Sequence, residues 1–183
     1  MMSKSSPLKE LNGIVPSLHT PFNKDKSIDY KSLKKLILHT IKTNCAGMLV
    51  TAVAGETQSL TFKEKSELME FILNINNDKI PIIFGCSSSS IEEIYSLVEL
   101  ARQKHVKWFL IQAPMNLDEN ELIKFYKKIN EIGPSHLMIQ DLSWDGYGLS
   151  DNIIKKLMDK VPKFKSLKIE VVNSGLKYSN IKK

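Results

Sequence analysis

The sequence predicts an α/β protein with a parallel sheet, and three observations support this fold class. Short apolar runs alternate with segments of helical spacing in six units, which recur about every thirty residues. A helix between consecutive strands returns the chain to the same end of the sheet, so the strands run parallel. The 183 residues, 42% of them hydrophobic, can bury one sizeable core, which indicates a single domain.

The expected strands are short runs rich in apolar residues. In chain order they cover residues 11–18, 46–52, 80–84, 107–112, 136–140 and 166–172. In the last of them the apolar residues alternate, which puts Leu167 on one face and Lys168 on the other. If both faces are covered, Lys168 is buried, and if this is an edge strand, Lys168 points into water. The strand by itself leaves both possibilities open.

The expected helices follow the strands, and capping signals mark where several of them begin. Asp29 precedes a helix over residues 30–42, and Thr61 with Glu64 forms a capping box for a helix that extends to residue 75. Ser90 caps a helix that runs to about residue 104. Further helices are expected at about 118–130, at 150–160 and after the last strand.

Two architectures accept this order of elements, an open doubly wound sheet and a (β/α)8 barrel. An open sheet that binds a dinucleotide carries a glycine-rich phosphate loop after its first strand. Here residues 19–22 read His-Thr-Pro-Phe, and no G-x-G-x-x-G occurs in the chain, so dinucleotide binding is not expected. In a barrel, the chemistry belongs at the carboxyl ends of the strands, where Lys168 lies.

Composition excludes several classes of protein. The net charge of +6 comes almost entirely from lysines spread along the expected helices, with Arg102 as the single arginine, which indicates a solvated surface and no nucleic-acid partner. No apolar run is long enough for a membrane span or a signal peptide, so we expect a cytoplasmic protein without a membrane partner. Neither the two cysteines nor the four histidines show metal-ligand spacing, and no metal is expected.

A set of motifs in this order resembles the dihydrodipicolinate synthase / N-acetylneuraminate lyase family. The residues that carry the resemblance are Gly13, Thr20-Pro21-Phe22, Asp29, Leu33, Gly47, Gly55-Glu56, Leu60, Glu64, Gly85 with the serines after it, Ala113-Pro114 and Lys168. The resemblance implies a (β/α)8 TIM barrel, of which about six βα units are present, with residues 1–10 as an N-terminal tail and 11–183 as an incomplete barrel domain.

The resemblance also implies an activity. Members of this family form a Schiff base between a barrel lysine and a 2-oxo acid, and Lys168 matches that lysine. A buried ammonium loses hydration, which favours the neutral amine that attacks a carbonyl carbon. The protonated imine is itself the electron sink, so no cofactor is expected.

Departures from the family's pattern concentrate at the expected site. The turn that holds the substrate carboxylate in the family would correspond to the substrate-binding residues Val53, Ala54, Gly55 and Glu56, in which two threonine hydroxyls are absent. At the end of the fifth expected strand, the family's proton-relaying tyrosine is replaced by Gln140.

Glutamine exchanges no proton at neutral pH, so another group must transfer the proton during the reaction. The next residue, Asp141, is a candidate, as is Glu170, although the simpler interpretation of either is a supporting or surface carboxylate. The candidate catalytic residues are therefore Lys168, Gln140 and Asp141.

Two functions remain open at this level. The first is a Schiff-base lyase or aldolase, a carbon-carbon or carbon-oxygen lyase acting on a 2-oxo acid or a sugar-acid-derived substrate. The second is a catalytically silent barrel fragment with a binding or assembly role. Because six units leave sheet edges uncovered, the chain is expected either to be a truncated form of a longer protein or to form a homo-oligomer.

Overall fold

The structure is a computed structural model that describes residues 11–182, so the predicted N-terminal tail over residues 1–10 lies outside the described part. Its centre is a five-stranded sheet in the order β1-β2-β3-β4-β5, in which every neighbouring pair is parallel. The strands are β1 (Met48–Val50), β2 (Ile82–Gly85), β3 (Trp108–Gln112), β4 (His136–Leu142) and β5 (Phe164–Glu170).

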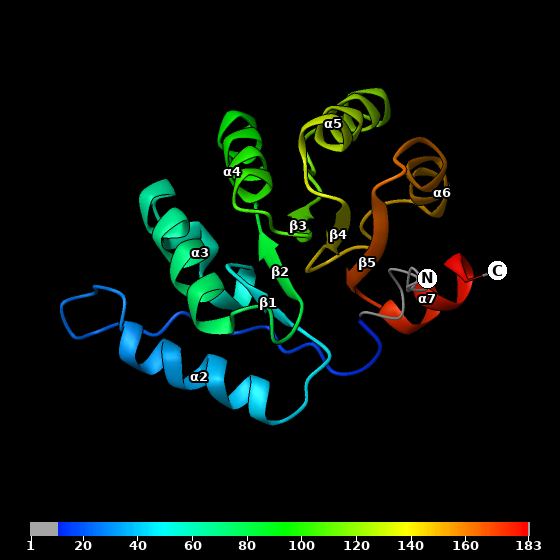
Figure 1. Cartoon of the computed structure of the whole chain (residues 1–183). Coiled ribbons are helices and arrows are strands. Elements are labelled where there is room, and N and C mark those ends of the chain that lie inside the picture. Colours follow the sequence, from blue (N-terminus) through cyan, green and yellow to red (C-terminus); the bar gives the residue numbers. More distant parts are fainter. Residues whose placement is uncertain (1–10, 183) are drawn as a thin grey trace, which may run out of the picture.

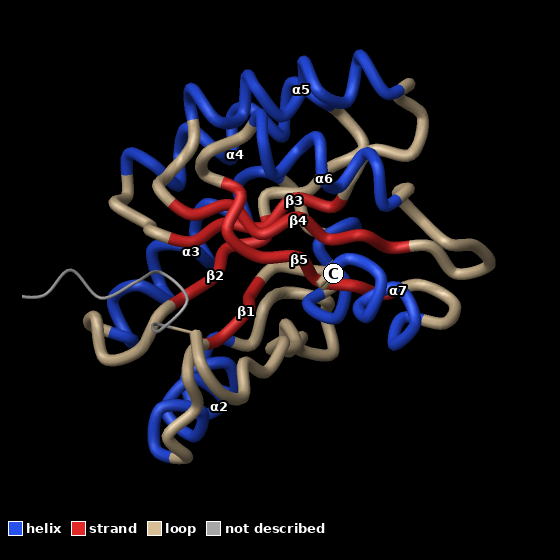
Figure 2. Tube along the Cα trace, turned by 90° about the vertical axis from the view of Figure 1, so that its right-hand side faces the viewer, coloured by secondary structure: helices blue, strands red, loops and turns tan. Residues whose placement is uncertain are grey.

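Within residues 11–182, six α-helices alternate with the strands and follow an arc around the sheet (Figure 1). They are α2 (Tyr30–Lys42), α3 (Phe62–Asn76), α4 (Ile91–Gln103), α5 (Glu119–Ile132), α6 (Asp151–Lys160) and α7 (Ser174–Ile181). The side view shows the strands in the middle of the molecule with helices outside them (Figure 2). Within residues 11–182, no helix combines the length and apolar character needed to cross a membrane. The predicted α/β class with a parallel sheet is confirmed.

The capping signals place the helix starts as predicted. Asp29 accepts a hydrogen bond from Ser32 N and begins α2, whose bounds match the predicted 30–42. Thr61 and Glu64 form both hydrogen bonds of a capping box at α3. These interactions lie within four residues of sequence, which is why the sequence alone predicts them.

The prediction of a first strand over residues 11–18 is wrong, because this segment forms no regular strand. Residues 11–18 run beside β1 but make a single isolated bridge, Ser17 with Leu49, and form no strand. Leu49 N donates to Pro16 O at 2.9 Å, and Leu18 N donates to Leu49 O at 2.8 Å. Proline has no N–H to donate and so interrupts a regular ladder at this position.

The two faces of the sheet carry different cores. The larger core lies between the sheet and the helices and includes Val50, Phe84, Phe109 and Ile139. A smaller cluster on the other, inner face consists of Leu49, Ala52, Ile83, Trp108 and Leu110. Successive residues of a strand point to opposite faces, so residue parity along each strand decides which side chains line the inner face.

Candidate active site

A row of polar residues crosses the inner face at the carboxyl ends of three strands. Gln112 of β3 is paired in register with Gln140 of β4, and Gln140 with Lys168 of β5. Residues paired in this way on adjacent strands lie about 5 Å apart with their side chains on the same face. Sheet register alone therefore brings the predicted residues Gln140 and Lys168 together.

Glu170 joins these two side chains. Its Oε2 atom forms an ion pair with Lys168 Nζ and accepts a hydrogen bond from Gln140 Nε2. The Lys168 side chain is 27% exposed and that of Glu170 is 42% exposed. Lys168 is thus half-buried, between the two possibilities that the sequence left open.

The charge state of Glu170 follows from its partners. Burial by itself would raise the pKa of Glu170, but the hydrogen bonds from Lys168 and Gln140 and the charge of Lys168 hold that pKa below its ordinary value of 4.5. The carboxylate is therefore ionised at neutral pH and can accept a proton.

Gln140 has a defined amide orientation. Because Glu170 can only accept, the amide nitrogen of Gln140 faces it, and Oε1 must point elsewhere. The Gln140 side chain is buried, and within the described residues its Oε1 has no hydrogen-bond partner. A buried acceptor without a donor costs free energy, so a bound ligand that donates a hydrogen bond here would recover it.

Asp141, the third predicted catalytic residue, is not brought to Lys168. It is paired in register with Ile169, whose side chain lies on the helix-facing side of the sheet. Its Oδ1 accepts from Leu149 N at 2.9 Å, and its carboxylate forms an ion pair with Lys177. Of the two carboxylates considered from sequence, Glu170 is the one that contacts Lys168.

The predicted substrate-binding residues form a tight turn at the carboxyl end of β1. Residues Val53–Gly55 form a short 3₁₀ helix, and Glu56 follows with a left-handed φ of 57°. The N–H groups of Gly55 and Glu56 donate to Ala52 O at 2.9 Å and Val53 O at 3.0 Å. Both N–H groups are therefore engaged within the turn. Together with the absence of the two threonine hydroxyls, this reduces the number of donors that the turn offers to a substrate carboxylate.

A cavity of about 530 Å³ opens beside this row, and the sequence did not predict it. Its polar lining comes from Gln58, the serines at 87–90, Glu92, Gln112 and Asn116. Ser90 caps α4 by accepting from Glu93 N at 3.3 Å, as expected. Ser87 accepts from Gln112 N at 2.8 Å, which links the cavity wall to the polar row.

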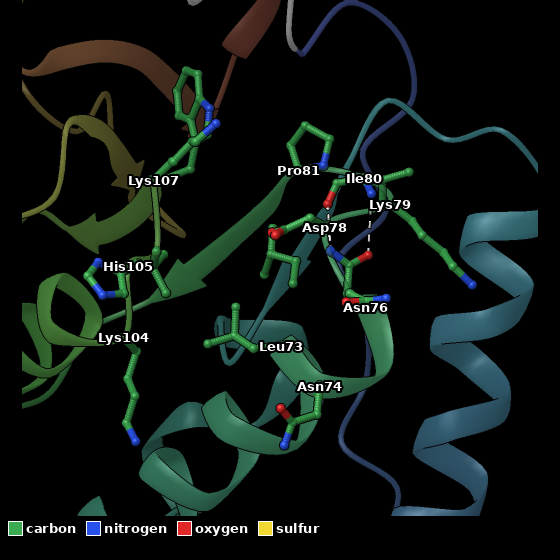
Figure 3. A pocket seen from close by; sticks show the side chains of 14 residues that line it. Leu73, Asn74, Asn76, Asp78, Lys79, Ile80, Pro81, Lys104, His105 and Lys107 are labelled. Atoms are coloured by element: carbon green, nitrogen blue, oxygen red, sulfur yellow. Dashed lines mark hydrogen bonds between the residues drawn. The ribbon is translucent and has the colours of Figure 1, made fainter.

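A second cavity, of about 790 Å³, lies at the opposite end of the strands. It is bounded by the end of α3 and by the segments that enter β2 and β3, including Pro81 and Lys107. In Figure 3, Leu73 projects toward it, whereas the Lys79 side chain points away. Barrel enzymes place their chemistry at the carboxyl ends of the strands, so the candidate active site is at the Lys168 end despite the smaller cavity there.

The sequence of this chain is similar to those of curated synthases. The chain resembles the 4-hydroxy-tetrahydrodipicolinate synthase of Rickettsia montanensis, with 30% identity over 159 residues, which cover 85% of this chain and 53% of the relative. It also resembles the synthase of Karelsulcia muelleri, with 32% identity over 107 residues, 58% of this chain and 36% of the relative. The chain thus spans about half or less of the length of these curated relatives.

Solved structures share the fold. The 4-hydroxy-tetrahydrodipicolinate synthase of Methylacidiphilum fumariolicum superposes with a TM-score of 0.85 at 23% identity, covering 92% of this chain and 57% of the other. The N-acetylneuraminate lyase of Mycoplasma synoviae gives 0.82 at 22% identity, covering 94% and 58%. The family model described as the dihydrodipicolinate synthetase family matches residues 10–182. This chain therefore belongs to the dihydrodipicolinate synthetase family.

Proposed function

We propose that this protein is a Schiff-base lyase or aldolase that acts on a 2-oxo acid or sugar-acid-derived substrate through Lys168. The observation that carries the proposal is the group of three side chains at the carboxyl end of the sheet. There Glu170 contacts both Lys168 and Gln140. Relatives named as synthases and lyases of the same family support the reaction class.

The three residues have separable roles. Glu170 accepts a proton from the Lys168 ammonium, and the resulting amine attacks the carbonyl carbon of the substrate. Glu170 returns this proton to the oxygen of the adduct and then transfers a second proton from the attacking nitrogen to the same oxygen, which leaves as water when the protonated imine forms. Gln140 exchanges no proton, and it orients Glu170 through its amide nitrogen.

The surroundings of the row indicate the kind of substrate. Val53 and Ala54 offer no hydroxyl to a carboxylate, and an unpaired buried carboxylate is costly, so the substrate should be less acidic than that of the synthases. Among the polar residues that line the neighbouring cavity, only Glu92 is charged, and the others are amides and hydroxyls. This lining favours a substrate whose part beyond the 2-oxo acid group is neutral and hydroxylated. The missing hydroxyls at Val53 and Ala54, taken alone, would favour an apolar part instead.

Borohydride trapping tests the proposal. The protein is incubated with pyruvate and a panel of hydroxylated 2-oxo acids, reduced, digested and analysed by mass spectrometry. We expect a reduced adduct on Lys168, none in Lys168→Ala, and an undiminished adduct in Lys165→Arg, which changes an exposed lysine of the same strand. If the folded protein forms no adduct with any 2-oxo acid, the enzyme proposal fails and the silent barrel fragment takes its place.

A further inference from the structure

The most deeply buried lysine in the described chain is Lys177 of α7, not Lys168. Its side chain and that of Asp141 are both 0% exposed, and the two form an ion pair. Lys177 Nζ also donates to the backbone carbonyls of Tyr147 and Leu149, the latter at 2.6 Å. An ammonium has three N–H donors, and all three are used. Lys177 therefore has no free donor and adjoins no described cavity, which argues against a role as a second nucleophile.

These contacts gather three segments at one point. Lys177 comes from α7, Asp141 from β4, and both carbonyls from the loop between β4 and α6. Asp141 holds the same loop from its other oxygen, through Leu149 N. Gly148 has a φ of +70°, and a Cβ there would lie 2.8 Å from Val171 and closer still to Asp141. The loop is thus fitted closely around the buried carboxylate.

We propose that Lys177 is a positioning residue for the reaction at Lys168, because its ion pair with Asp141 fixes the adjacent Gln140 against Glu170. Gln140 and Asp141 share a peptide bond and point to opposite faces of β4. With Asp141 held at both oxygens, the backbone that it shares with Gln140 is restrained, which keeps the Gln140 amide within reach of Glu170. The inference rests on the proposed function.

Other ionisable groups near the ion pair do not replace Lys177. Burial raises the pKa of Tyr126 on α5, with the charge of Asp141 as a further cause, so this phenol stays neutral. Tyr147 presents its ring to Lys177 Nζ at 4.4 Å, and its hydroxyl donates to Asp151 at 2.7 Å. Among the described residues, Lys177 is thus the cation that forms an ion pair with Asp141.

The test uses Lys177→Met, the double variant Asp141→Asn/Lys177→Met, and Lys182→Met as a control at an exposed lysine just beyond α7. The double variant removes both buried charges and keeps an acceptor for Leu149 N. It is therefore expected to fold more readily than Lys177→Met, which leaves the Asp141 carboxylate buried without its cation. One readout is the Glu170 titration by carboxyl 13C NMR, assigned with Glu170→Gln. The other is the rate of imine trapping at Lys168.

Loss of Gln140's hydrogen bond removes one cause of the lowered pKa of Glu170, so we expect that pKa to rise in both Lys177 variants and to stay unchanged in the control. Trapping should slow by about tenfold, the effect of losing one hydrogen bond to a charged group. An unchanged Glu170 titration in the folded double variant would overturn the inference. If the wild-type protein traps no 2-oxo acid, the proposed function fails, but the titration still decides whether Lys177 fixes Gln140 against Glu170.

Discussion

At the scale of single residues, the contact between Glu170 and Lys168 leads to the most direct prediction. Glu170→Gln removes the proton acceptor but keeps a side chain of the same shape. We expect imine formation at pH 7 to fall by about 10²- to 10⁴-fold, the usual contribution of a positioned acid/base group. Single-turnover trapping on Lys168 measures the rate. Glu119→Gln, which breaks a surface ion pair with Lys156, is the matched control and should react at the wild-type rate.

The pH dependence follows from the same carboxylate. The pKa of Glu170 in the folded protein lies below 4.5, so Glu170 is a proton acceptor at pH values above its folded pKa. The contribution of Glu170 to the free energy of unfolding has the same pH dependence. Because the pKa of Glu170 is lower in the folded protein than in the unfolded chain, this contribution is fully present above the unfolded pKa and is lost as the pH falls through the folded pKa. We therefore expect trapping to decline only below about pH 4.5, an acid limb that Glu170→Gln abolishes. An acid limb that persists in that variant would assign it to another group.

Substrate selectivity also belongs to single side chains. Val53 and Ala54 carry no hydroxyl in the turn where the family resemblance predicts that the substrate carboxylate binds. Burying a substrate carboxylate without hydrogen-bond donors or a cation is costly, so this site should reject the substrates of the synthases. We expect no turnover of aspartate semialdehyde with pyruvate, measured by a coupled spectrophotometric assay. Efficient turnover would show that other groups bind the carboxylates.

At the scale of elements, Gly85 controls how closely β1 and β2 approach. A Cβ at Gly85 would lie 2.6 Å from the carbonyl carbon of Thr51 and 3.0 Å from Ala52 N, and backbone atoms cannot move aside cheaply. We expect Gly85→Ala to lower the free energy of unfolding by about 1–3 kcal/mol, as overpacking does. Gly175→Ala is the control: apart from its chain neighbours and the local backbone of α7, no atom lies within 4 Å of the added Cβ, so the change should be neutral or slightly stabilising in chemical denaturation.

Local signals explain which elements could be predicted from the sequence. The caps at Asp29 and Thr61 act within one turn, so helix starts were predictable, whereas the run over 11–18 failed as a strand because Pro16 cannot donate. Period-two alternation places Gln140 and Asp141 on opposite faces of β4, although their adjacency in the sequence makes both candidates for one site. Lys177 carried no comparable signal, because nothing local shows that a helical lysine meets a buried carboxylate from β4.

At the scale of the whole molecule, the sheet has two edges within residues 11–182. Beside β1, residues 11–18 supply only a few hydrogen bonds, and β5 pairs on one side with β4 and with no described strand on the other. An uncovered strand exposes backbone donors and acceptors that can pair with another chain. Exposed apolar side chains near this edge, including Val172, Leu176 and Tyr178, add to the surface that association could bury.

We therefore expect the 183-residue chain to associate through these edges, as a homo-oligomer or as larger aggregates. Leaving about 400 Å² of apolar surface in water forfeits roughly 10 kcal/mol at about 25 cal/mol per Å², which is comparable with the net stability of a domain. Association that buries this surface makes stability depend on concentration. Light scattering should show a mass above 20.8 kDa, and the denaturation midpoint should rise with protein concentration. A monodisperse monomer with a cooperative, concentration-independent transition and ordinary domain stability would mean that the described edges are already sufficiently covered within one chain.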